Sequence, residues 1–311
     1  MPTGYPAEFR RLLQEILNQD RPLVYGQLRV LSNLRPEDLA LFGRAWPGAH
    51  PDRRRQIARA LAQLNEDNPD MNFRDVLLLC LSDPDEDVRV AAIEGLSDDE
   101  SFAFLEQLAL LVAEDTSVPV RSAAILSLGR FAYLMETTDL FGSYRQRLLR
   151  LLLGLFDDPG VPLEVRRRAI ETVSYLGSEP EVEEAIGRAY TAVEREMHAS
   201  AIHAMGHHMA ERWRPLLERE LDSPDAQMRY EAALACGEMG DPGLVQHLAP
   251  LLDDEDHEVA QAAIWALGEI GGPQARRLLQ RAVESPDEDI REAAEEALYT
   301  LQFYEDPMRL F

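Results

Sequence analysis

Lysine is absent from the 311-residue sequence, cysteine occurs only twice, and no apolar run approaches the length of a membrane span. Without lysine, the chain cannot form a Schiff base through that residue or provide the lysine of a Walker-type phosphate loop. Cys80 and Cys236 both lie among apolar residues, which predicts buried hydrophobic side chains rather than a disulfide or a metal pair. The N-terminal residues lack the charged and then apolar pattern of a signal peptide, so the sequence predicts a cytoplasmic protein without a membrane segment.

Basic residues are scarce relative to acidic ones. The 31 arginines stand against 56 aspartates and glutamates, which gives a formal net charge of −25. Affinity for nucleic acid depends largely on basic contacts to phosphates. We therefore predict no nucleic-acid binding, and a protein or peptide with a cationic or apolar segment is the better candidate partner.

Motifs that would commit the chain to one chemistry are missing as well. The sequence has no G-x-S-x-G, no glycine-rich phosphate loop and no evident Cys-His nucleophile pair. His203 and His207 are four residues apart and so share one face of a helix, as two metal ligands would, but isolated histidine pairs are usually not metal sites. We predict a non-enzymatic protein with no catalytic residue, metal or cofactor, and the sequence alone leaves metal binding at this pair open.

What the sequence does contain is a repeat. The strings LSDPDEDVRVAAIEGLS from Leu81, LDSPDAQMRYEAALACGEMGD from Leu221 and LLDDEDHEVAQAAIWALGEIGG from Leu251 share an acidic turn, an apolar residue and then small and apolar residues. We call the first apolar residue after each turn the anchor. The anchors recur every 31 or 32 residues, with one spacing of 45, at Val88, Val120, Val165, Met197, Met228, Val259 and Ile290. A weaker copy with Arg53 at the anchor position extends the repeat back to about residue 51.

The residues after each anchor have the spacing of an amphipathic helix with an alanine-rich buried stripe. A second helical pattern lies between successive anchors, for example LVQHLAPLLDD from Leu244, and Gly240 and Pro242 mark a helix stop and a helix start. Each copy is therefore predicted to be a hairpin of helix A and helix B. One hairpin cannot bury its own apolar face, so the sequence predicts an all-α fold, an α-solenoid of stacked antiparallel hairpins.

These residues resemble the HEAT repeat family, in the short variety typified by phycobilisome lyase subunits, whose repeats read roughly D-P-x-x-V-R-x-x-A-A-x-A-L-G. The resemblance covers about residues 51–311. It implies that the arginine after each anchor pairs with carboxylates of the turns; this position holds Arg54, Arg89, Arg121, Arg166, Arg229 and Arg291, whereas His198 and Ala260 break the series. It also implies an alternative function, a bilin lyase-like subunit that handles a tetrapyrrole chromophore.

Two segments depart from the repeat. Residues 1–50 do not fit it and are predicted to form an N-terminal helical cap, because terminal repeats need a different outer face. An insertion around residues 135–162 accounts for the long spacing between Val120 and Val165. We expect it to lengthen a helix A and the loop beside it within the solenoid of residues 51–311.

The functional hypothesis is a protein-interaction scaffold, since solenoids present extended concave surfaces. The resemblance implies that helix B lines the concave side, with its variable positions two, six and ten residues after each anchor. On the last repeats these positions predict a partner-binding patch with aromatic, apolar and histidine residues inside an acidic rim. Its members are His203, His207, Tyr230, Leu234 and Trp265, rimmed by Glu171, Glu238 and Glu269. The alternative is that Trp265 and Leu234 simply pack between repeats.

Overall fold

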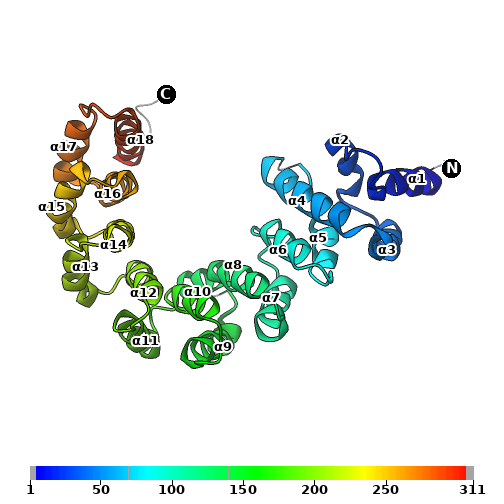
Figure 1. Cartoon of the computed structure of the whole chain (residues 1–311), viewed down its shortest axis with the longest axis horizontal. Coiled ribbons are helices and arrows are strands. Elements are labelled where there is room, and N and C mark those ends of the chain that lie inside the picture. The colour runs from blue at the N-terminus through cyan, green and yellow to red at the C-terminus, as the bar shows by residue number, and fades with distance from the viewer. Residues whose placement is uncertain (1–4, 69, 139, 306–311) are drawn as a thin grey trace. The chain divides into compact units, whose positions relative to one another are not determined.

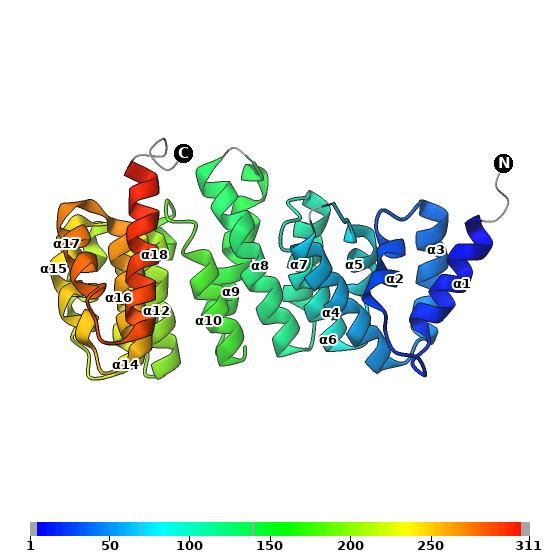
Figure 2. The same ribbon diagram turned by 90° about the horizontal axis from the view of Figure 1, so that it is seen from above.

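The computed structural model describes residues 5–68, 70–138 and 140–305. Within these ranges there is no strand, and every regular element is an α-helix or a short 3-10 helix. The helices stack as consecutive hairpins, which confirms the predicted all-α solenoid (Figures 1 and 2). Of the helices in the described part of the chain, none is both long and apolar enough to cross a bilayer.

The chain divides into two compact units, residues 1–131 and 132–311, and each is described by itself. The helices of the first unit are α1 (Tyr5–Leu17), α2 (Tyr25–Leu28), α3 (Pro36–Ala45), α4 (Pro51–Asp67), α5 (Arg74–Cys80), α6 (Glu86–Glu94), α7 (Phe102–Glu114) and the first part of α8 (Val118–Thr137). In this unit α4 packs beside α6, and α3 packs beside α5.

The second unit continues the hairpins in two layers (Figure 1). Its outer helices are α9 (Arg145–Asp157), α11 (Pro180–Tyr190), α13 (Arg214–Leu221), α15 (Val245–Leu248) and α17 (Gly272–Ala282). Its inner helices are α10 (Leu163–Val173), α12 (Arg195–His208), α14 (Ala226–Met239), α16 (His257–Ile270) and α18 (Glu288–Glu305). Each inner helix from α10 to α16 packs on the next one, so the inner helices form a continuous face.

The anchors form the core, as the repeat predicts. All seven apolar anchors, from Val88 to Ile290, are buried. Arg53, at the anchor position of the first copy, is also buried, and its guanidinium donates to the backbone carbonyls of Asn18 and Arg21. An arginine is therefore used here to connect the first repeat to the segment that follows α1.

The acidic turns start the inner helices. Asp85, Asp225, Asp256 and Asp287 each accept a hydrogen bond from the backbone N–H two residues later, at the beginning of the following helix. These carboxylates satisfy N–H groups that have no partner inside the helix and place negative charge at the positive end of its dipole. The acidic runs are thus explained by helix capping.

The arginine after the anchor pairs with the turn of the next repeat in three places. Arg54 lies 3.0 Å from the carboxylate of Asp83. Arg89 donates two hydrogen bonds to Asp115, at 2.8 and 3.0 Å, and Arg229 donates two to Asp254, at 2.7 and 2.8 Å. The pairing that the resemblance implies is confirmed at these positions. Arg121 and Arg166 instead donate to the backbone carbonyls of Val112 and Phe156.

The insertion lengthens helix B, which the sequence did not predict, and the expectation of a longer helix A stays a prediction. Helix α8 has 20 residues, whereas α12, α14 and α16 each have 14. Those three helices end at residues with positive φ, namely Met209, Gly240 and Gly271. After Arg130 the chain has no glycine before Gly142, and α8 continues to Thr137. Helix α9 has 13 residues, the same as α7.

At the start of the chain, α3 has the position of an outer helix. It packs beside α5 as α13 packs beside α15 in the second unit. A capping function therefore suits α1 and α2 better than α3, and a boundary at residue 50 stays a prediction.

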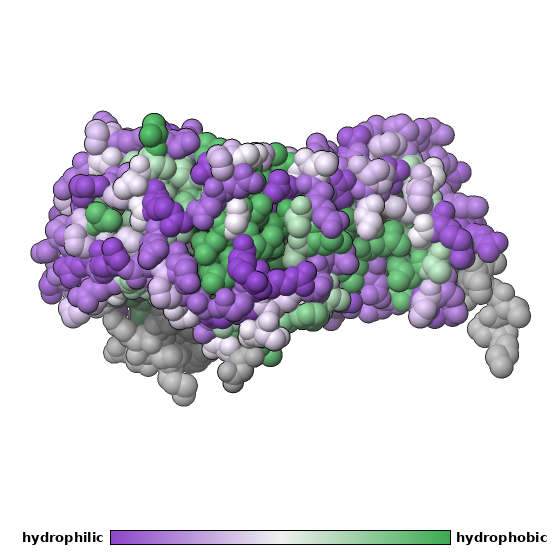
Figure 3. Space-filling model, turned by 90° about the horizontal axis from the view of Figure 1, so that it is seen from below, coloured by the Kyte–Doolittle hydropathy of each residue, from purple (hydrophilic) through white to green (hydrophobic). Residues whose placement is uncertain are grey.

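Some hydrophobic side chains lie at the surface. Phe102 and Leu110 of α7 are exposed, and the face in Figure 3 has hydrophobic patches among hydrophilic residues.

Candidate partner-binding face

Glycine lets the inner helices of the second unit approach closely. A Cβ atom added at Gly206 would lie 2.7 Å from the Cα of Ala235, and one at Gly237 would lie 2.9 Å from the Cα of Ala266. The second contact is the first one moved along by one repeat, because Gly206 and Gly237 are 31 residues apart, as are Ala235 and Ala266. Side chains next to these contacts cannot enter the interface. His207 and Glu238, which follow the two glycines, lie beside it, with His207 largely covered and Glu238 exposed.

The two predicted histidines of α12 meet each other. The Nε2 atoms of His203 and His207 are 3.0 Å apart, and the hydroxyl of Tyr175, just beyond the end of α10, lies 3.2 Å from His207 Nε2. The tyrosine ring also packs on the His207 ring, with centroids 4.3 Å apart. The structure thus brings together residues of two neighbouring repeats.

A carboxylate stands behind each imidazole. Glu231 Oε2 is 3.6 Å from His203 Nδ1, and Glu238 Oε2 is 3.7 Å from His207 Nδ1. Burial, together with the neighbouring His203, lowers the pKa of His207 to about 4. Burial also opposes the charged form of His203, but Glu231 and the other nearby glutamates leave its pKa raised. Burial raises the pKa of the Glu238 carboxyl.

Glu171, predicted on the rim, lies beneath the surface. Its side chain is buried, and its oxygens accept hydrogen bonds from Arg168 at 2.8 Å and from the Ser200 hydroxyl at 2.6 Å. Both oxygens are engaged, so this residue joins α10 to α12 and does not offer a carboxylate to a partner. The sequence pattern identifies the helix face but not the depth at which a residue lies.

Trp265 lies at the surface of α16. It is 37% exposed, and its ring lies over Gly237, where an added Cβ would be 2.5 Å from the ring atom Cζ3. With Gly268, Ala293 and Ala297 it lines a groove of about 280 Å³ between α16 and α18, bordered by Glu269 and Glu296. The indole therefore forms one wall of an apolar groove with acidic edges.

Tyr230 lines a different cavity, of about 460 Å³, between α14 and α16. Acidic residues dominate its walls, namely Asp225, Glu231, Asp256 and Glu258. One arginine, Arg195, also lines it, and its guanidinium is paired with Asp225 at 2.5 Å. The cavity therefore has carboxylates beside an aromatic ring, which is a suitable environment for a cationic side chain.

The other predicted residues differ in exposure. Leu234 is half-buried, and Glu238 and Glu269 are exposed. Sequence reasoning left Tyr175, Glu231 and Glu258 out of the predicted patch. The signal for Tyr175 was present, because it follows its anchor by ten residues as His207 does, and equivalent positions of neighbouring repeats lie side by side.

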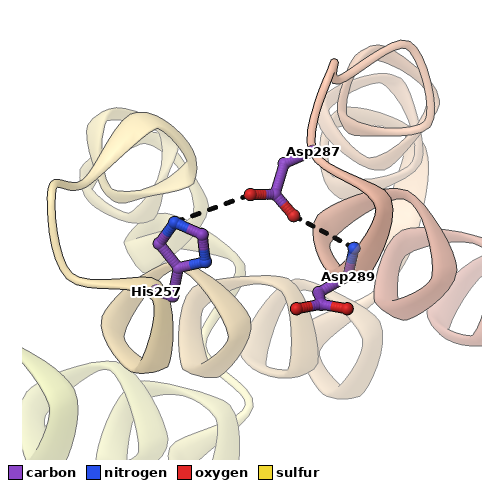
Figure 4. A group of neighbouring side chains, drawn as sticks. All are labelled: His257, Asp287 and Asp289. Atoms are coloured by element: carbon purple, nitrogen blue, oxygen red, sulfur yellow. Dashed lines mark hydrogen bonds and ion pairs between the residues drawn. The ribbon is translucent and has the colours of Figure 1, made fainter.

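A third histidine forms a separate cluster with two aspartates (Figure 4). One ligand atom each of His257, Asp287 and Asp289 lies within 4.8 Å of the others, and the group could hold a metal ion. His257 Nε2 is 3.5 Å from Asp287 Oδ2, while Asp287 Oδ1 accepts the backbone N–H of Asp289. The imidazole is 63% exposed. The main structural contribution of Asp287 is to cap α18.

The comparisons with known proteins agree with this architecture. The family model for HEAT repeats matches residues 44–129 and 213–299. A chain of the Kap95:Nup1 complex has 15% identity and a TM-score of 0.55, and a chain of the structure of Kap95p bound to RanGDP has 17% identity and a TM-score of 0.53. Each alignment covers 97% of this chain, which spans 47% of either larger one.

An engineered protein of known structure shows 18% identity and a TM-score of 0.43, with 94% of this chain and 88% of its own chain covered. No curated protein matches the sequence. At these identities the structural similarities concern the fold alone. The family model matches more than half of the chain, and the chain therefore belongs to the HEAT repeat family.

Proposed function

We propose that this protein is a non-enzymatic scaffold that binds a partner protein or peptide on the inner helices of its second unit. The observation that supports this most directly is the pairing of two cavities along α16. The acidic cavity beside Tyr230 suits an arginine or lysine side chain, and the groove beside Trp265 suits an apolar one. Aromatic residues inside a polar rim are typical of interaction hot spots.

The spacing of the cavities defines the partner segment. Glu258 of the acidic cavity and Trp265 of the groove are seven residues apart on α16, so they lie on the same face of the helix, about 10 Å apart at 1.5 Å per residue. An extended peptide rises about 3.3 Å per residue. Since the two cavities also lie on different sides of α16, the partner segment should carry a basic residue and an apolar residue three or more positions apart.

The charge of the chain adds to this expectation. A net charge of −25 attracts cationic segments and repels the phosphates of nucleic acid. We expect no appreciable binding of duplex DNA at moderate salt. Peptide binding should weaken as ionic strength rises, because part of the acidic cavity is exposed to solvent. The tetrapyrrole alternative stays a prediction, and a bilin absorbance band in the natively purified protein would support it.

A peptide-display selection against the immobilised full-length chain tests the proposal. Selected peptides should share the basic and apolar spacing, and Tyr230→Ala or Trp265→Ala should weaken binding of a selected peptide about tenfold or more. Tyr133→Ala is the matched control, because Tyr133 is an exposed aromatic residue of α8. Circular dichroism checks that each variant retains its helices. Unchanged binding by both the Tyr230 and Trp265 variants would refute the proposed face.

A further inference from the structure

The histidine pair of α12 has the separation of two ligands on one metal ion. Two nitrogens bound at 2.0–2.1 Å to the same divalent transition metal lie roughly 2.9–3.4 Å apart for coordination angles between square-planar and tetrahedral values. The Nε2 atoms of His203 and His207 are 3.0 Å apart. The two rings meet edge to face, with centroids 4.6 Å apart. The α12 helix therefore holds both Nε2 atoms together at a chelating distance.

Each imidazole also has the partner that metal-binding histidines commonly have. In such sites, the ring nitrogen away from the metal faces a carboxylate, which fixes the tautomer and makes the ligand nitrogen more basic. Here the Nδ1 atoms face Glu231 and Glu238 at 3.6 and 3.7 Å. Both carboxylates come from α14, so the outer partners of the two histidines belong to the next repeat. With the ring proton of each histidine on Nδ1, both Nε2 lone pairs point to the same place, and a metal ion would replace the hydrogen bond between the two Nε2 atoms.

The surroundings favour a cation at this place. Glu171, Glu231 and Glu238 all act electrostatically on His203. The side chain of His207 is 11% exposed and that of His203 is 38% exposed. The site is therefore sheltered on one side and open to solvent on the other.

We propose that His203 and His207 bind one divalent transition-metal ion of the zinc class through their Nε2 atoms. Water, or a side chain of a bound partner, fills the remaining coordination positions. Imidazole ligands suit zinc, copper and nickel, whereas calcium and magnesium prefer oxygen ligands. The proposal rests on the histidine geometry and does not depend on the partner-binding function.

The second histidine cluster supplies an internal control. His257 and Asp287 are more exposed than His207, and Asp287 is already used to cap α18. A metal ion bound only there would behave as an ion attracted to a solvated acidic turn. Substitution of His257 therefore distinguishes metal binding by His203 and His207 from the general attraction of cations to an acidic protein.

Zinc titration of the full-length, untagged, chelator-treated chain in competition with a chromophoric zinc indicator tests the site. We expect one ion per chain. His203→Ala and His207→Ala should each weaken binding at least tenfold, whereas His257→Ala should not change it. Glu238→Gln should weaken binding by about tenfold, the lower end of the range for outer partners of metal-bound histidine. Circular dichroism without metal checks the fold of each variant.

X-ray absorption at the zinc edge provides a readout that does not depend on the variants. It should show two imidazole ligands on the bound ion. The proposal is overturned if the native chain takes up no zinc, if the His203→Ala/His207→Ala double variant binds zinc as the native chain does, or if His257→Ala removes the binding.

Discussion

The arginines after the anchors form two groups, and the difference between them lies in the turn of the next repeat. Arg54, Arg89 and Arg229 reach a carboxylate there, whereas Arg121 and Arg166 reach only backbone carbonyls. In the first group, the residue five positions before the next anchor is aspartate, at Asp83, Asp115 and Asp254. In the second group the same position holds Gly160 and Ala192.

The two repeats that lack the arginine are also followed by a turn that lacks the aspartate. After His198 and Ala260, the position five residues before the next anchor holds Ser223 and Ser285, and each serine hydroxyl accepts a hydrogen bond from a turn N–H. The aspartate in the first group accepts a similar turn N–H, as Asp254 does from Asp256. A turn can therefore form without a carboxylate, and in these repeats aspartate occurs at this position only where an arginine follows the preceding anchor.

Removal of an arginine from each group should give the largest difference. Arg229→Met leaves the half-buried carboxylate of Asp254 without the two hydrogen bonds that Arg229 donates, and should lower the free energy of unfolding by about 2 kcal/mol. Arg166→Met removes a hydrogen bond to a backbone carbonyl and should lower it by about 1 kcal/mol. Urea unfolding followed by circular dichroism measures both changes. Equal losses in the two variants would contradict the distinction between the groups.

The arginine pairs were expected only from the resemblance to HEAT repeats, and three of them form. The repeat itself predicts the helical hairpins and all seven buried anchors. The length of α8 was not predicted, because the repeat pattern does not show that the usual helix stop is missing there. Helix α14 stops at Gly240, but the chain after Arg130 has no glycine before Gly142.

The candidate site was less predictable than the fold, because it depends on how closely successive helices approach. Trp265 stays accessible because its ring lies over Gly237 of the preceding repeat. Glu171 follows its anchor by six residues, as Trp265 does, but its side chain is buried and accepts hydrogen bonds from Arg168 and Ser200. The number of residues from the anchor indicates which face of the helix a side chain is on, but not how exposed the side chain is. The sequence therefore predicted the helix face and did not predict which of its residues are buried.

Addition of a carboxylate to a turn that lacks one should move Arg166 from the second group to the first. Ala192 is half-buried and precedes Met197 by five residues, the position at which Asp254 stands before Val259. We expect Ala192→Asp to raise the free energy of unfolding by about 1 kcal/mol, the upper end for a partly exposed ion pair. Urea unfolding of Ala192→Asp with and without Arg166→Met checks this, and a gain that persists without the arginine would show that the new pair does not form.

The smallest expected effect is a pH dependence that distinguishes the two groups. The hydrogen bond from Arg229 lowers the pKa of Asp254 below its ordinary value of 3.8, against the opposing effect of burial. The folded state thus binds this proton less readily than the unfolded state, so the stabilisation is complete well above pH 3.8 and is lost as the pH falls through the lower folded value. The stability difference between the native chain and Arg229→Met should therefore be constant near neutral pH and narrow below pH 3.8. The difference between the native chain and Arg166→Met should not narrow in that range, because a backbone carbonyl does not titrate there. Urea unfolding at a series of pH values measures both differences, and parallel curves for the two variants would show that Asp254 does not provide the charge that Arg229 binds.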